Sequence, residues 1–349
     1  MIDGDLLQPN PPDVGPVKGP RIWLWLASIV TGAILAFAAF AVPIPAFFAL
    51  LPGPVEDVED LVRITDARSY ESEGSLFLTT VSVDDSVTFS EIVGSWFDDN
   101  RHIVSREAFT AGQSNNDFAK QQRLEMKNSK QNAREVALAA LGFGRPEGKG
   151  ARVEATLDDS PAQGVLREGD VIVEIDGEEV GTTCDVGRAI DQHEVGDEVE
   201  VVVRRNGELK TFELDTVKNP LDPTTPIVGI SMTDVGYAFD PGVEVDIETG
   251  EIGGPSAGLM FALAVYDRLT PGDLTGGRKI AGTGTIECDG GVGPIGSIEL
   301  KVAGAQQKGA EVFFAPQVDV EAAESVESGI DVVAVSTFDE AVEYLEGLD

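Results

Sequence analysis

The residues best suited to chemistry lie between Gly254 and Lys301. Gly254-Pro255-Ser256-Ala257-Gly258 fits the pattern G-x-S-x-G, in which a serine stands at a turn that enters a helix. The first N–H groups of such a helix, here those of Ser256 and Ala257, can stabilise a negatively charged oxygen. A serine before an apolar helix can instead serve as its N-cap. The motif therefore predicts either a nucleophile or a helix cap at Ser256.

A serine nucleophile needs a base, and the positions of the histidines disfavour histidine in that role. His102 and His193 both precede Ser256, whereas an α/β-hydrolase triad needs the chain order serine, acid, histidine. An esterase of that type is therefore disfavoured. A lysine can act as the base if burial or a cationic neighbour lowers its pKa enough to make it neutral. The segment after Ser256 offers Lys279, Lys301 and Lys308.

Helical spacing gives Lys301 a slight advantage over the other two lysines. Its i±3 and i±4 neighbours are all small or apolar, and no carboxylate is among them to hold a proton on the amine: Ser297, Ile298, Gly304 and Ala305. Lys308 lies on the same face but next to Gly309, where the predicted helix ends. The spacing thus favours Lys301 as the buried amine.

Other sites are excluded or disfavoured by the sequence. The run Gly291 to Gly296 fits G-x-G-x-x-G but contains a proline, which predicts a glycine-rich turn rather than a dinucleotide site. No P-loop motif occurs, and Cys184 and Cys288 are too few for a cysteine-based zinc site. We expect no cofactor and no metal. The two cysteines fall in different units, so two buried thiols are favoured over an interdomain disulfide.

Near the N-terminus, Ile22–Val42 runs for 21 residues without a charge, long enough for a helix of roughly 30 Å. Lys18 and Arg21 precede this run, and acidic residues follow it from Glu56 onward. The positive-inside rule therefore predicts a single-pass anchor with a cytoplasmic N-terminus and an extracytoplasmic catalytic part. A cleaved signal peptide is the alternative, because Ala39-Phe40-Ala41 resembles a cleavage site.

The rest of the chain predicts an α+β fold in several units. After a tail at 1–21 and the anchor at 22–42, we expect a β-rich and helical segment at 55–132, a small β-rich domain at 133–217 and a terminal domain at 227–349. Asn206-Gly207 between two β-rich runs predicts a type I′ hairpin in the small domain. In the terminal domain, strands alternate with helices, and one helix is expected at 256–269 and another at 297–308.

Three segments of the terminal domain together resemble Lon-type serine proteases. They are 252–261 around Ser256, 280–286 around Thr283, and 293–301, which ends at Lys301. The resemblance implies that Ser256 is the nucleophile, that Lys301 is the general base and that Thr283 orients the lysine. Because the chain carries no ATPase motif, the resemblance also implies ATP-independent proteolysis.

Two residues depart from the Lon pattern. Gly253 stands where full-length Lon proteases have an aspartate, which affects how the active-site loop is ordered and whether the enzyme is active by itself. Ser297 stands where a second glycine is usual.

The small domain resembles a bacterial PDZ domain. The resemblance rests on Ser160-Pro161-Ala162, on 169–172 and on Asp176-Gly177. It implies that a loop binds the C-terminal carboxylate of a peptide, and a helix C-cap followed by a turn is the alternative for the same residues. The loop would consist of Leu141, Gly142, Phe143 and Gly144.

The whole arrangement is similar to the membrane-anchored, PDZ-containing Lon-like proteases of bacteria. The resemblance extends over 22–349 and is weakest in 84–130. It implies a serine endopeptidase that acts on protein or peptide substrates, with a homo-oligomer left open because Lon-type domains commonly form rings. A membrane-tethered PDZ adaptor with a non-catalytic Lon-like domain is the alternative.

The charge of the chain adds one exclusion. There are 61 acidic and 25 basic residues among 349, for a net charge of −36. Such a surface repels phosphate backbones, so nucleic-acid binding is disfavoured. Nearly all of the negative charge lies beyond residue 54, in the part predicted to be exported, and a high-salt habitat would explain it.

Overall fold

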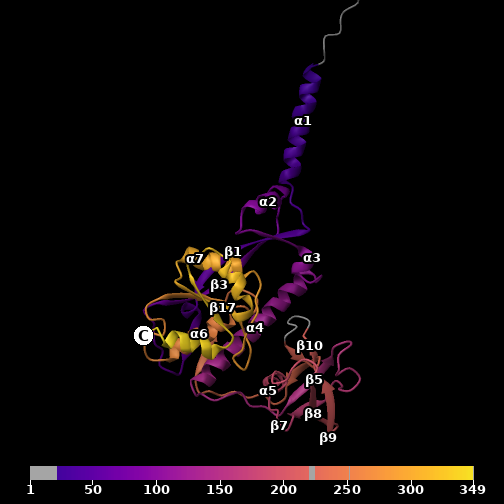
Figure 1. The fold of residues 1–349 in the computed structure, drawn as a ribbon, viewed down its shortest axis with the longest axis vertical. Helices are drawn as coiled ribbons and strands as arrows, with labels where there is room; N and C mark the ends of the chain where they lie inside the picture. Colours follow the sequence, from indigo (N-terminus) through magenta and orange to yellow (C-terminus); the bar gives the residue numbers. More distant parts are fainter. Residues whose placement is uncertain (1–21, 220–224, 251, 349) are drawn as a thin grey trace, which may run out of the picture.

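The computed structural model describes residues 22–219, 225–250 and 252–348. The predicted tail at 1–21 and the middle of the proline-rich linker, 220–224, lie outside these residues. The first described helix is α1 (Ile22–Ala41), which coincides with the predicted apolar helix. It extends away from the folded part, and α2 (Phe89–Gly94) lies at its inner end (Figure 1). Within the described ranges, no helix has both the length and the apolar character that crossing a membrane requires.

The larger folded unit is built on a mixed six-stranded sheet. Its order is β18-β17-β14-β3-β1-β4. β14 runs parallel to β3 and β17, whereas β1 is antiparallel to both β3 and β4. The strands are β1 (Phe47–Asp57), β3 (Ser75–Asp84), β4 (His102–Ser105), β14 (Lys279–Gly282), β17 (Val312–Pro316) and β18 (Asp331–Val335).

Helices and short strands complete this unit. The short strands pair as β2 (Val62–Thr65) with β13 (Glu244–Ile247) and β15 (Thr285–Ile286) with β16 (Val292–Gly293). The α-helices are α3 (Arg106–Phe109), α4 (Asn115–Ala140), α6 (Gly258–Leu269), α7 (Ile298–Lys308), α8 (Val320–Glu324) and α9 (Phe338–Glu346). The 3₁₀ turns are η1 (Glu59–Leu61), η2 (Ser95–Phe97) and η3 (Gln317–Asp319).

The sheet joins segments that the sequence assigned to separate units. β1, β3 and β4 come from the segment expected at 55–132 and the residues just before it, whereas β14, β17 and β18 come from the terminal domain. Ile280 of β14 pairs with Leu76 of β3 on one side and with Val312 of β17 on the other. The β-rich N-terminal segment therefore completes the sheet of the terminal domain.

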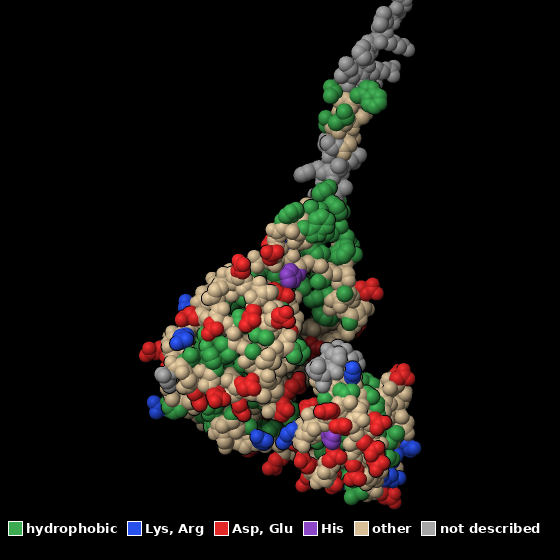
Figure 2. Space-filling model, in the orientation of Figure 1, with side chains coloured by type: hydrophobic (Ala, Val, Ile, Leu, Met, Phe, Trp, Pro, Cys, Tyr) green, Lys and Arg blue, Asp and Glu red, His purple; other side chains and the backbone are tan. Residues whose placement is uncertain are grey.

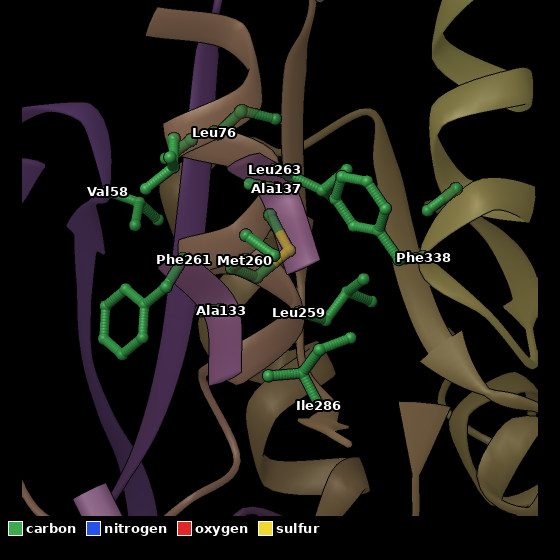
Figure 3. Packing of buried hydrophobic residues seen from close by; sticks show 14 of the residues in the cluster. Val58, Leu76, Ala133, Ala137, Leu259, Met260, Phe261, Leu263, Ile286 and Phe338 are labelled. Atoms are coloured by element: carbon green, nitrogen blue, oxygen red, sulfur yellow. The ribbon is translucent and has the colours of Figure 1, made fainter. Parts of the chain in front are cut away.

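The two helices that matter for the candidate site pack on opposite faces of this sheet. Side chains alternate along a strand, so Leu76 of β3 joins the core around α6, whereas Phe77 joins the core around α7. α6 is buried nearly all round, and Figure 3 shows Met260 and Phe261 within this packing. Each such side chain contributes about 1.5–3 kcal/mol by leaving water, which fixes the start of α6 firmly.

The smaller unit has its own sheet and its own core. The sheet order is β12-β5-β6-β8-β9, with β7 paired to β6, and α5 packs against it. Asn206 and Gly207 both have positive φ between β8 and β9, as the predicted type I′ hairpin requires. The elements are β5 (Ala151–Thr156), β6 (Val171–Ile175), β7 (Glu178–Glu179), α5 (Thr183–Ile190), β8 (Glu198–Arg205), β9 (Glu208–Asp215), β10 (Val217–Lys218), β11 (Pro226–Ile227) and β12 (Ile230–Asp234).

A disulfide joins the two units, and this corrects the preference for two buried thiols. Cys184 in the first turn of α5 is bonded to Cys288 in the β15–β16 turn, with 5.8 Å between the Cα atoms. The sequence could not show that α5 would pack beside a turn 104 residues further along the chain.

The disulfide predicts a specific loss of stability. Replacing both Cys184 and Cys288 by serine is expected to lower the free energy of unfolding by about 2–5 kcal/mol, because a cross-link over a long loop restricts the unfolded chain. Denaturant unfolding measures this difference. Reductant should lower the unfolding midpoint of the wild-type chain and leave that of the double variant unchanged. Equal midpoints of the wild-type chain and the double variant in the absence of reductant would contradict the cross-link.

Candidate active site

Ser256 lies on the loop that leads into α6, and tight packing fixes that loop. The carbonyl oxygen of Ser256 accepts a hydrogen bond from Gly284 N at 2.8 Å and another from the Thr283 hydroxyl at 2.9 Å. A Cβ atom on Gly258 would lie 2.6 Å from the Ile286 side chain, so only glycine fits at the start of the helix. The cap position of α6 is Ala257 and no side chain caps it, so the N-cap interpretation of Ser256 is wrong.

Lys301 is the buried amine that the spacing favoured. It is 3% exposed on α7, and its Nζ donates a hydrogen bond to Thr283 Oγ1 at 2.8 Å. Thr283 in turn donates to the Ser256 carbonyl, so one hydroxyl connects the lysine to the backbone of the serine. Thr283 follows β14 directly, at the carboxyl end of that strand, where the helices on the two faces of the sheet can meet.

Burial lowers the pKa of Lys301 to about 7 from its ordinary value of 10.5. Removal of the ammonium from water is the main cause, and the negative charge of Asp319 opposes it. A large fraction of the amine is therefore neutral near neutral pH, as a general base requires.

Asp319 is a residue that the sequence reasoning missed. Helical neighbours of Lys301 include no carboxylate, but the negative charge of Asp319, which lies on a different element, η3, acts on the lysine electrostatically. The carboxylate accepts a hydrogen bond from Ile295 N at 2.9 Å, which holds the segment before α7 in place. Burial raises the pKa of Asp319, while the bond from Ile295 and the charge of Lys301 lower it. No helical periodicity could have indicated this pair, because the two residues share no element.

Ser256 and Lys301 line the same pocket, which has a volume of about 820 Å³. Most of its other side chains are apolar, and they extend from the serine loop over β1, β3, α3 and α4. The apolar residues are Leu50, Pro54, Val81, Val83, Phe109, Phe118, Ile252, Pro255, Ala257, Pro294 and Ile295. The pocket therefore offers an apolar surface beside a serine and a buried amine.

The backbone conformation at Ser297 is one that favours glycine, the residue that is usual at this position of the Lon pattern. It caps α7 with φ 56° and ψ 47°, a left-handed conformation that costs most residues about 1–2 kcal/mol and glycine almost nothing. Ser297 therefore holds a left-handed conformation that a glycine would adopt with less strain.

Helix α4 supports the serine loop, a role that the sequence did not indicate. Gly254 N donates to the Gln122 carbonyl at 3.2 Å, and the Ser129 hydroxyl donates to the Pro255 carbonyl at 2.9 Å. Asn132 Nδ2 donates to the Ile286 carbonyl at 2.9 Å. Gly253, which replaces the usual aspartate, lies close to Gln122 as well. Hydrogen bonds from α4 thus hold the serine loop in place. The polar residues of α4 that form them belong to no recognisable sequence motif.

The backbone N–H groups expected to stabilise an oxyanion are those of Ser256 and Ala257. Ser256 and Ala257 precede the first turn of α6, where N–H groups lack partners within the helix. Among the described residues, no backbone hydrogen bond uses the N–H group of either one. Both residues also line the pocket.

The predicted carboxylate-binding loop follows the end of α4. The N–H groups of Leu141, Gly142 and Phe143 bond to the carbonyls of Ala137, Ala139 and Leu138. Gly142 and Gly144 have positive φ. This geometry is that of a helix C-cap, the alternative for these residues, and peptide binding by the loop stays a prediction.

The described residues contain no group of three or more His, Cys, Asp or Glu side chains arranged to hold a metal ion.

Comparison with known proteins identifies two domain types. Residues 124–216 match the family described as PDZ domain, and residues 240–346 match the Lon protease (S16) C-terminal proteolytic domain. The chain therefore combines a PDZ domain with a Lon-type proteolytic domain. The N-terminal strands of the larger unit, β1 to β4, lie outside both matches.

Several known proteins are similar to parts of the chain. Lon protease 2 of Bacillus subtilis is 32% identical over 32% of this chain and 18% of its own length. Lon protease 1 of the same organism is 36% identical over 26% of this chain and 12% of its own length. The solved PDZ domain of the SdrC-like protein from Listeria innocua is 27% identical, covers 24% of this chain and 92% of that domain, and has a TM-score of 0.22. The chain thus matches less than a fifth of the length of these Lon proteases.

Proposed function

We propose that this chain is an ATP-independent serine endopeptidase with a Ser256–Lys301 dyad. The observation that carries the proposal is the buried Lys301 amine, which shares a pocket with Ser256 and is linked to its backbone through Thr283. A buried lysine is costly unless it has a partner or a function, and here its pKa is lowered to about 7.

In the proposed reaction, neutral Lys301 takes the proton of the Ser256 hydroxyl as Oγ attacks a peptide carbonyl. The N–H groups of Ser256 and Ala257 stabilise the resulting oxyanion. Collapse of this intermediate breaks the peptide bond, and Lys301 gives its proton to the leaving amine. Water then attacks the acyl ester with the same lysine as base, which restores the free serine.

The remaining parts of the proposal concern position and recognition. We place the catalytic part outside the cytoplasm, anchored by the apolar run 22–42, on the basis of its composition and flanking charges. The PDZ domain would bind extended segments of protein substrates and deliver them to the pocket. We further propose that the chain assembles into a homo-oligomer, as Lon-type domains commonly do.

The proposed function is tested by cleavage of an unfolded protein. The purified full chain, in detergent with a chelator and without ATP, should convert the substrate to peptides with multiple turnovers. A membrane-tethered PDZ adaptor would bind the same substrate without cleaving it. Saturable binding with no new peptide ends would favour that alternative.

The lowered pKa predicts the pH dependence of cleavage. Because the base must be neutral, kcat/KM should rise as pH increases through about 7 and level off above it. The variant Asp319→Asn removes the charge that raises the pKa of Lys301 but keeps an oxygen for Ile295 N. Its profile should therefore shift to lower pH. A wild-type midpoint near 10.5, or an Asp319→Asn profile that coincides with the wild-type profile, would contradict the assignment of Lys301 as the base.

A further inference from the structure

Exposed apolar side chains gather where α1 meets the folded part. We call Phe40, Val42, Phe89, Trp96 and Phe97 the aromatic patch. Trp96 is 76% exposed and Phe97 is 87% exposed, and the other three are between 43% and 57% exposed. Figure 2 shows hydrophobic side chains concentrated at this end of the molecule, whereas acidic side chains are spread over much of the visible surface elsewhere.

The aromatic patch is held at the end of α1 by specific contacts. The rings of Phe40 and Phe89 pack edge to face, with 4.8 Å between their centroids. Pro43 forms a bridge with Thr88, and Ile44 N donates to the Val87 carbonyl at 2.7 Å. Thr88 starts α2 with a capping box, and η2 with Trp96 and Phe97 follows α2 directly. The position of the two aromatic residues relative to the last turn of α1 is therefore built into the fold.

The charged groups near the aromatic patch limit what can cover it. Glu91 is paired with Arg101 at 2.9 Å, and Asp84 accepts a hydrogen bond from Ser86. Asp98 and Asp99 follow Phe97 and are exposed. An anionic partner is therefore disfavoured at this end, and a surface that is apolar and zwitterionic fits better.

We infer that the aromatic patch contacts the lipid surface next to α1, with Trp96 and Phe97 entering the headgroup region of the bilayer. This inference rests on the proposed anchor. Tryptophan prefers the membrane interface because its ring is apolar and its N–H can still reach polar groups. The patch is continuous with α1 through Phe40, so the bilayer holding α1 meets these side chains first. A second contact would fix the tilt of the catalytic part, which a single helix cannot do.

The test uses Trp96 as a fluorescent probe in the full chain. Trp23, Trp25 and Trp96 are the three tryptophans, so the variant Trp23→Phe/Trp25→Phe leaves Trp96 alone. It is reconstituted into phosphatidylcholine vesicles with and without bromine near the headgroup end of the acyl chains. The control chain also carries Trp96→Phe and Leu209→Trp, which places the only tryptophan at an exposed position of β9.

We expect the emission of Trp96 to shift to shorter wavelength on reconstitution and to fall at least about twofold with brominated lipid. The control should show neither change. Vesicle flotation measured on the same samples separates the two proposals. A chain that floats while Trp96 behaves like the control would overturn the lipid contact but keep the anchor. A chain that does not float would overturn both. A wavelength shift without quenching would indicate that a second copy covers the patch, and would also overturn the inference.

Discussion

Replacing Lys301 by methionine is expected to abolish peptide cleavage and to stabilise the fold. Methionine matches the length and volume of lysine but cannot accept a proton, so kcat should fall by about 10⁴-fold. Only part of the amine is protonated at pH 7 in the folded chain, whereas the unfolded chain protonates it fully. The lowered pKa of about 7 therefore reduces the free energy of unfolding at pH 7 by an amount on the order of 4 kcal/mol. Methionine carries no charge and removes this reduction.

The measurements are cleavage rate and denaturant unfolding of the same protein. The matched control is Lys308→Met, on the same helix but exposed, for which the rate should stay near wild type. Its stability should fall by no more than about 1 kcal/mol, through loss of the cation–π contact with Phe77. The wild-type chain should gain stability as pH rises between about 7 and 10.5, because the unfolded lysine still binds a proton there. This gain should be smaller for Lys301→Met. A Lys301→Met chain that retains activity would exclude the lysine as base.

Replacing Ser256 by alanine is expected to have the largest effect on cleavage. Only one oxygen is lost, and the serine contributes to the fold mainly through its carbonyl, which alanine keeps. We therefore expect a loss of about 10⁴-fold or more in kcat with little change in substrate affinity or stability. The control Ser325→Ala removes an exposed hydroxyl that bonds the Ala322 carbonyl, and it should leave cleavage unchanged.

The comparison of the two variants also distinguishes the dyad from other mechanisms. Groups that act as a unit are not additive, so the double variant should be no slower than the slower single variant. If the fold-losses in kcat of the two single variants multiplied in the double variant, Ser256 and Lys301 would not act together.

Local signals predicted much of the fold because they depend on neighbouring residues. The glycines around Ser256, the helix that follows it and the Asn206-Gly207 turn all appear as expected. Lys301 could be favoured because its helical neighbours are small and apolar. Thr283, by contrast, was identified through resemblance, since no spacing rule links a threonine just after one strand to a lysine on a later helix.

Contacts between distant segments could not be predicted in the same way. The pairing of β3 with β14 joins residues about 200 positions apart, and the strands carry no code for that partner. The same holds for Asp319 beside Lys301, for the hydrogen bonds from α4 to the serine loop, and for the disulfide. Each depends on how whole elements pack, which a single sequence does not specify locally.

The central claim is that Ser256 attacks the substrate, and a covalent intermediate tests it most directly. The full chain should be mixed with an activated peptide ester without ATP, quenched in acid during turnover, digested and analysed by mass spectrometry. We predict that the peptide containing Ser256 gains the mass of the acyl group in the wild-type chain, and that the Ser256→Ala chain shows neither adduct nor turnover. Turnover at equal rates by the two chains, with no adduct on Ser256, would contradict the account.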